Sequence, residues 1–140
     1  MDTMRLYRAE AGERERAMRA LATALETEPD VEFAWLHGSF LACGAFHDVD
    51  VGVHLLPAAG GRPYRGVELA LHLGRAARFP VDVRVLNDAP VAFLFHVFRT
   101  GRPLICRADE RMADLMERTA REYLDGEPLL RRATVEAFGG

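Results

Sequence analysis

Residues 38–50, which read GSFLACGAFHDVD, connect two segments that favour β-strands. Residues 31–37 (VEFAWLH), just before this stretch, are short and mostly apolar, as expected of a buried strand. Residues 48–56 (DVDVGVHLL) alternate, so that apolar side chains fall on one face and Asp48 and Asp50 on the other. The sequence therefore predicts two successive strands joined by a short turn or helical loop.

The remaining elements follow from hydrophobic periodicity and from Gly, Pro and Asp signals on both sides of these strands. We expect helices at 13–27, 64–78, 91–99 and 109–125, a strand at 81–86 and a short extended piece at 104–106. A Gly/Pro-rich loop is expected at 57–63. This order, α-β-β-α-β-α-α, predicts an α/β (α+β) fold, a small mixed sheet with helices packed mainly on one face.

The 140 residues fit a single domain, 1–140, with a core at about 31–110 and a C-terminal helix at 109–125. Two helices carry apolar stripes. The stripe of the 64–78 helix is expected at Val67, Leu71 and Gly74, and that of the last helix at Met112, Leu115, Met116, Thr119 and Tyr123. Asp109 is a good N-cap for the last helix, and Asp125-Gly126 is expected to end it, leaving a weakly patterned tail from Glu127 onward.

Composition excludes several classes of function. The formal net charge is −3, so direct nucleic-acid binding is not predicted. Every cationic side chain is arginine, which excludes a lysine Schiff base and a Walker-type P-loop lysine. The N-terminus lacks the apolar segment of a secretion signal, no apolar run is long enough for a membrane span, and Cys43 and Cys106 follow no metal-binding pattern. We therefore expect a cytoplasmic protein with free thiols.

Three aspartates have the pattern of a metal site. Asp48 and Asp50 are two residues apart on one strand, so both carboxylates project from the same face. Like charges held this close favour a cation between them, and hard carboxylate oxygens suit Mg²⁺. Asp82 lies on a second alternating strand, and if the two strands are neighbours it completes a two-metal site of the kind used in phosphoryl transfer.

Gly38-Ser39 supplies a complementary feature. A glycine at a strand end lets backbone N–H groups approach a phosphate, and the serine hydroxyl adds a donor. The ordered combination of strand-Gly-Ser, Asp-x-Asp and a later strand aspartate resembles the nucleotidyltransferase domain of the DNA polymerase β superfamily, and is most similar to the minimal nucleotidyltransferases, or MNT proteins. Residues 81–107 (VDVRVLNDAPVAFLFHVFRTGRPLICR) extend the resemblance, which covers roughly residues 31–110. Eight residues separate Ser39 from Asp48, fewer than in most of that family, which predicts a tighter turn.

The resemblance implies transfer of a nucleoside monophosphate, AMP from ATP, with Mg²⁺ held by Asp48, Asp50 and Asp82 and phosphates held by Gly38 and Ser39. It also implies a protein partner, since many MNT proteins are antitoxins that AMPylate a tyrosine of a small helical HEPN toxin. Two other functions stay open: a non-catalytic antitoxin that acts by occlusion, and a transferase acting on a small molecule. The sequence leaves self-association open.

Several of these residues also fit other interpretations. Asp48 and Asp50 also fit a solvated strand face, and Asp88 fits a helix cap. A zinc site among His37, His47 and His54 is disfavoured because no pair has standard spacing. Arg84 and Arg102 fit surface or ion-pair positions better than phosphate contacts, and the Met112–Tyr123 stripe fits core better than a partner-binding face.

Overall fold

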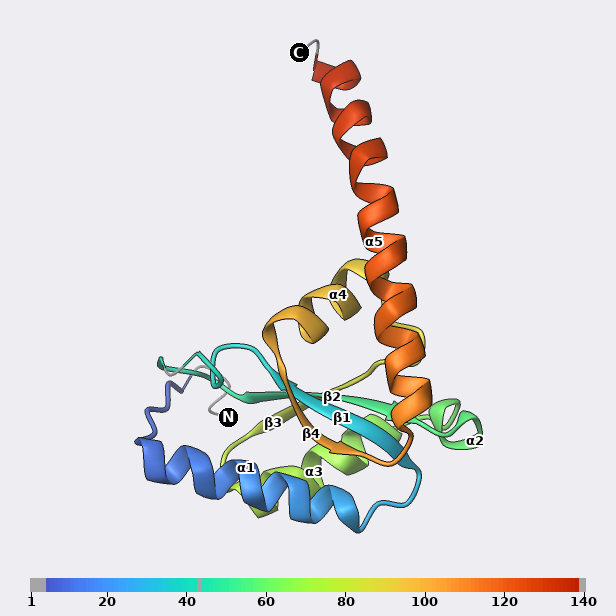
Figure 1. Cartoon of the computed structure of the whole chain (residues 1–140). Helices are drawn as coiled ribbons and strands as arrows, with labels where there is room; N and C mark the ends of the chain where they lie inside the picture. The colour runs from blue at the N-terminus through green and yellow to red at the C-terminus, as the bar shows by residue number, and fades with distance from the viewer. Residues whose placement is uncertain (1–4, 43, 139–140) are drawn as a thin grey trace.

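The computed structural model describes residues 5–42 and 44–138 and shows a four-stranded sheet flanked by helices (Figure 1). The elements are α1 (Ala11–Glu26), β1 (Val31–His37), β2 (Val49–Leu55), α2 (Pro57–Gly60), α3 (Arg65–Ala77), β3 (Val81–Val85), α4 (Val91–Thr100), β4 (Arg102–Cys106) and α5 (Asp109–Phe138). The strands lie in the order β3-β2-β1-β4, in which β1 is antiparallel to β2 and β4, and β2 is parallel to β3. The mixed sheet predicted from the sequence is confirmed.

Because side chains alternate along each strand, the hydrophobic core has one part on each face of the sheet. The valines of β2 pack with α1 and α3 on one face, around Leu21, Leu69 and Leu73. On the other face, Phe33 and Trp35 of β1 pack against α4 and the first part of α5. Every residue of β1 is buried, so both faces of the central strand need a cover. The helices therefore lie on both faces (Figure 1), α1 and α3 on one and α4 and α5 on the other, rather than mainly on one as expected.

Most predicted boundaries are confirmed to within two residues, but three differ. The 57–63 loop begins with the short helix α2, whose first residue is a proline with its backbone angle already suited to a helix. The 104–106 piece belongs to the longer strand β4, which pairs with β1. The last helix does not end at Asp125-Gly126 but continues to Phe138.

The predicted stripe of α3 was wrong. Val67 and Leu71 are 58% and 60% exposed, whereas Leu69, Leu73 and Ala77 are buried against the sheet. Leucines recur along this helix at 69, 71 and 73, so the sequence offers two stripes, and only packing selects between them. The α5 stripe is confirmed, since Leu115 and Thr119 are buried and Tyr123 stacks on Phe95 with ring centroids 4.1 Å apart. Within the described residues, no helix combines the length and apolar character that a membrane span requires.

Candidate active site

The parallel pairing of β2 and β3 places two of the predicted aspartates side by side. Asp50 and Asp82 are direct register partners, and Asp48 lies immediately before β2. The neighbouring valines of both strands pack into the core under α1 and α3, so the aspartates lie on the opposite face of the sheet, the face that carries α4. The condition that the two strands be neighbours is therefore met.

The electrostatics of Asp50 show how closely the three carboxylates interact. Partial burial, together with the negative charges of Asp48 and Asp82, raises the pKa of Asp50 to about 6, and Arg84 partly offsets this increase. A carboxyl group in this state is destabilised as an anion and gains from any cation placed beside it. Asp50 is thus the centre of the acidic cluster.

Gly38 and Ser39 begin the turn that follows β1. Gly38 has φ +84°, which glycine adopts without strain, and it is the one positive-φ glycine among the described residues. A Cβ at this position would overlap the Oδ2 atom of Asp50 and lie 3.0 Å from its Cγ. The turn is closed by two hydrogen bonds, from the N–H of Leu41 to the Gly38 carbonyl and from the N–H of Ala42 to the Ser39 carbonyl. Gly38 therefore lies between the exposed Ser39 and the acidic cluster.

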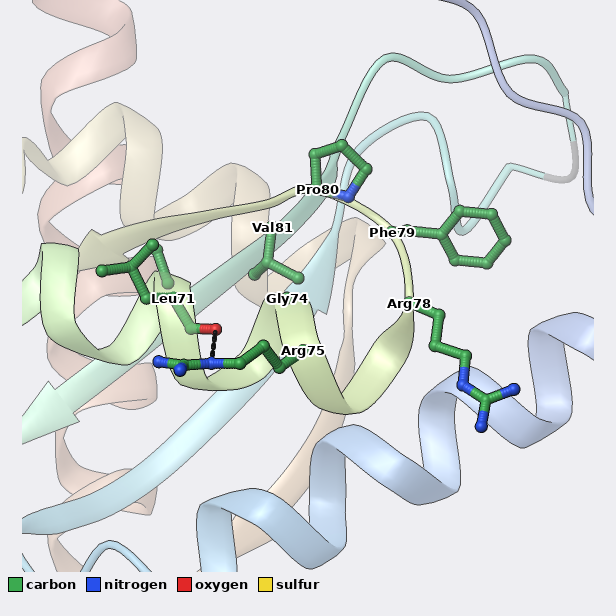
Figure 2. Close-up of a pocket in the computed structure, with 8 residues that line it drawn as sticks. Leu71, Gly74, Arg75, Arg78, Phe79, Pro80 and Val81 are labelled. Carbon is green, nitrogen blue, oxygen red and sulfur yellow. Dashed lines mark hydrogen bonds between the residues drawn. The ribbon is translucent and has the colours of Figure 1, made fainter.

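A cavity of about 350 Å³ opens beside this turn. It is lined by residues of the turn and of the C-terminal half of α4, namely Gly38, Ser39, Leu41, Ala42, His96 and Thr100. A larger cavity of about 550 Å³ lies between α3 and the start of β3, and its residues pack on the other side of the sheet (Figure 2). The smaller cavity is the one adjoining the aspartates.

His37 is part of the site, although its predicted role was only that of a strand-end residue. It is the register partner of Asp50 on β1, is 6% exposed, and packs edge-on against Phe93 of α4 with centroids 5.5 Å apart. Burial lowers its pKa, with smaller effects from His96, Asp82 and Arg84. Its Nε2 atom is buried and has no hydrogen-bond partner among the residues that the structure describes. A polar strand end beside Gly-Ser was the only sequence signal for this position.

The short loop after Ser39 is held by a residue that sequence reasoning missed. Arg14 of α1 is 8% exposed and donates to the carbonyl oxygens of Phe40, Gly44 (2.9 Å) and Ala9 (3.0 Å). Its guanidinium also lies 5.0 Å from the ring centroid of Phe40 and 5.5 Å from that of Phe46. The tight turn expected from the short spacing is thus fixed by a buried arginine, a contact with no local signal in the sequence.

The other residues considered for chemistry have separate roles. Arg84 stacks over the Phe93 ring at 4.5 Å, beside the aspartates, whereas Arg102 lies on β4 near Met18 of α1. His54 contacts Glu32 at 3.2 Å, and His47 contacts the Arg5 carbonyl at 3.0 Å, so the three histidines do not converge.

Asp88 is not a helix cap, because Pro90 occupies the N-cap of α4, and Asn87 bonds instead to the backbone of Leu55. Cys106 is a free thiol, and Cys43 lies outside the described residues.

The donor set suits Mg²⁺, which takes one or two carboxylates together with phosphate oxygens and water. A cation bound at this site would reduce the charge repulsion at Asp50, and its ligands could pair with the unpartnered Nε2 of His37. Over the described part of the chain, three His, Cys, Asp or Glu side chains do not stand close enough together to share one ion. The residues therefore fit a metal held jointly with a phosphate better than one enclosed by protein ligands alone.

Comparison with known proteins agrees with this geometry. Residues 19–110 match the family described as "Polymerase beta, Nucleotidyltransferase". No match was found among curated proteins. A solved structure of a tri-AMPylated HEPN toxin of Shewanella oneidensis in complex with MNT antitoxin is similar at a TM-score of 0.68 and 19% identity, over 91% of this chain and 99% of that chain.

Two further structures are similar to the same degree. A toxin–antitoxin complex with AMP-PNP has a TM-score of 0.69 and 19% identity, over 88% of this chain and 98% of that chain. The toxin–antitoxin complex MntA-HepT has a TM-score of 0.67 and 19% identity, over 90% of this chain and 99% of that chain. The fold is thus that of the MNT antitoxins of HEPN–MNT pairs. Since the family match spans well over half of its length, the chain belongs to the polymerase β nucleotidyltransferase family.

Proposed function

We propose that this protein transfers AMP from Mg-ATP to a hydroxyl group of a protein partner. The observation that carries the proposal is the register pairing of Asp50 with Asp82, with Asp48 immediately before β2. This pairing concentrates negative charge on one face of the sheet, directly beside the Gly38-Ser39 turn. A phosphate-binding turn next to an acidic metal site is the arrangement that phosphoryl transfer requires.

Each residue has a proposed role. Asp48 and Asp50 would hold Mg²⁺, and Asp82 would complete a second metal site and assist removal of the acceptor proton. Gly38 and Ser39 would bind the β- and γ-phosphates through backbone N–H groups and the serine hydroxyl. Bound Mg²⁺ supplies charge neutralisation at the phosphates and lowers the pKa of the attacking hydroxyl.

The proposed partner is a small helical HEPN-type toxin, with this chain as the antitoxin. The family match and the similarity to chains from HEPN–MNT complexes, one of them with AMP-PNP and one with an AMPylated toxin, support this proposal.

The test is to incubate the protein with Mg-ATP and the product of its neighbouring gene, and to weigh that product by mass spectrometry. We expect a mass increase of one or more adenylyl groups, lost in the double variant Asp48→Asn, Asp50→Asn. Asp88→Asn is the matched control, because Asp88 is an exposed carboxylate outside the site. An adduct that persists in the double variant would refute the assignment.

The same experiment separates the two alternatives. A tight complex without any adduct would support the non-catalytic antitoxin, which neutralises by occlusion. Adenylylation of a small hydroxylated acceptor such as an aminoglycoside, with none on the protein, would support the small-molecule transferase.

A further inference from the structure

The outer face of α3 carries an apolar stripe with no cover among the described residues. Tyr64, Val67 and Leu71 recur at helical spacing and are 79%, 58% and 60% exposed. Single exposed apolar side chains are ordinary, but a continuous stripe indicates an interaction surface.

The stripe adjoins the larger cavity of about 550 Å³, between α3 and the start of the edge strand β3. Figure 2 shows Leu71 and Gly74 on α3 beside Val81 of β3, with the Arg75 guanidinium bonded to the carbonyl of Leu71 at 3.3 Å. A Cβ at Gly74 would lie 3.5 Å from the carbonyl oxygen of Phe79, so this glycine lets α3 approach the start of β3 at the cavity. No ion pair engages Arg75 or Arg78 in the described residues, whereas the exposed Glu68, two turns before Arg75, pairs with Arg62 on the surface.

We propose that this α3 face, formed by Tyr64, Val67, Glu68, Leu71, Gly74, Arg75 and Arg78, pairs with the same face of a second copy of the chain. Paired surfaces related by a two-fold axis must be self-complementary. If two α3 helices pack antiparallel about an axis at Leu71, each Leu71 meets its own copy. Val67 then lies at the level of Gly74 of the second copy, beside the apolar contact at the axis.

Charge complementarity favours this occupant over an unrelated protein. In the same arrangement Glu68 of each copy falls beside Arg75 of the other, so two ion pairs form by symmetry. Tyr64 falls opposite Arg78 of the second copy, at the end of the cavity, where a cation–π contact is available. The apolar centre and the charged rim of this face are therefore complementary to the same face of a second copy.

The pairing leaves the candidate active site free. Helix α3 covers the face of the sheet opposite that of Asp50 and Asp82. A dimer would therefore present two sites pointing away from the interface. This inference does not depend on the proposed function.

The test is the oligomeric state of the full chain, measured by sedimentation equilibrium from about 1 to 500 μM, where mass action governs a dimer. The monomer mass is 15.6 kDa, and we expect a concentration-dependent approach to twice that value. Leu71→Glu places two carboxylates at the axis and should leave only monomer. Leu124→Glu is the matched control, because Leu124 is a 54% exposed leucine on α5, and it should leave the dimer intact.

A charge exchange tests the register. Glu68→Arg and Arg75→Glu should each weaken dimerisation by roughly tenfold or more, since two pairs are lost and like charges meet. The double variant restores opposite charges and should recover the wild-type dissociation constant. Circular dichroism checks the fold of each variant. A wild-type monomer at all concentrations, a dimer that survives Leu71→Glu, or no recovery in the double variant would each overturn the proposal.

Discussion

A side chain at position 38 would collide with the carboxylate of Asp50, so glycine is the residue that fits there. An added Cβ would overlap Oδ2 of Asp50 and lie 3.3 Å from its Cβ, and the backbone is in the left-handed region at φ +84°. We expect Gly38→Ala to lower the free energy of unfolding by about 1–2 kcal/mol through backbone strain alone. Displacing Asp50 should also abolish Mg²⁺-dependent ATP binding.

Gly44→Ala is the matched control for this change. Gly44 belongs to the same short loop, but nothing lies within 4 Å of a Cβ built there. Urea unfolding monitored by circular dichroism should show no loss of stability for Gly44→Ala. Equal losses in the two variants would contradict the contact between Gly38 and Asp50.

Removing the charge of Asp50 should stabilise the metal-free protein while destroying its activity. The folded state raises the pKa of Asp50 from 3.8 to about 6, so its ionisation opposes folding. This penalty is absent below pH 4, grows as the pH rises toward 6, and is complete above that value. Asp50→Asn should therefore gain about 1–2 kcal/mol at pH 7.5 in EDTA, after allowance for solvent screening.

The pH dependence distinguishes this effect from a general gain in packing. The difference in melting temperature between Asp50→Asn and wild type should shrink as the pH falls from 6 to 4. Added Mg²⁺ with a non-hydrolysable ATP analogue should raise the melting temperature of the wild type and leave that of Asp50→Asn unchanged. A variant less stable than wild type at pH 7.5 would show that repulsion is not the dominant effect at Asp50.

The sequence predicted the strand faces on which the three aspartates lie, and the turn at Gly38-Ser39, because both signals are local. Alternation in 48–56 and 81–86 places each carboxylate on the polar face of its own strand. The three aspartates come together only if β2 and β3 are neighbours. Local alternation does not predict which strands are neighbours, and the resemblance to the nucleotidyltransferases was the reason to expect it.

Residues that support the site from a distance were not predictable in this way. Arg14 is one of several arginines in a charged helix, and only the packing of α1 against the 40–46 loop distinguishes it. His37 is recognised only from its neighbours in space, Asp50 on β2 and Phe93 on α4. The exposed stripe of α3 misled the prediction for a related reason, since periodicity shows that a face is apolar but not what covers it.

Arg14 should contribute to the order of the loop at 38–46, which carries the proposed phosphate-binding turn. Arg14→Met keeps the apolar stem but removes donors to the carbonyl oxygens of Phe40, Gly44 and Ala9. Leaving the buried carbonyl of Phe40 and the partly buried carbonyls of Gly44 and Ala9 without this donor should cost about 2–3 kcal/mol. Hydrogen exchange should accelerate in residues 38–46, and the KM for ATP should rise more than kcat falls. Arg19→Met, on the exposed side of the same helix, should change neither measurement.

Arg65 should control the stability of the protein in acid. This buried arginine donates to both carboxylate oxygens of Asp30 at 2.7 Å and also bonds to Glu28, joining the start of α3 to the segment before β1. The hydrogen bond from Arg65 lowers the pKa of Asp30. Burial alone would raise the pKa of Glu28, but bonds from Arg65 and His72 lower it overall.

Carboxylates with lowered pKa values stabilise the folded state above their ordinary values near 4, and this stabilisation is lost as the pH falls further. Arg65→Met removes the cation from two partly buried carboxylates and should cost about 2–3 kcal/mol at pH 7, somewhat less than for a fully buried pair. The difference from wild type should narrow below pH 4, where the carboxylates become protonated. Arg62→Met breaks only the exposed pair with Glu68 and should stay within about 0.5 kcal/mol of wild type. A loss for Arg65→Met that is the same at pH 7 and pH 3 would mean that Arg65 acts through packing rather than charge.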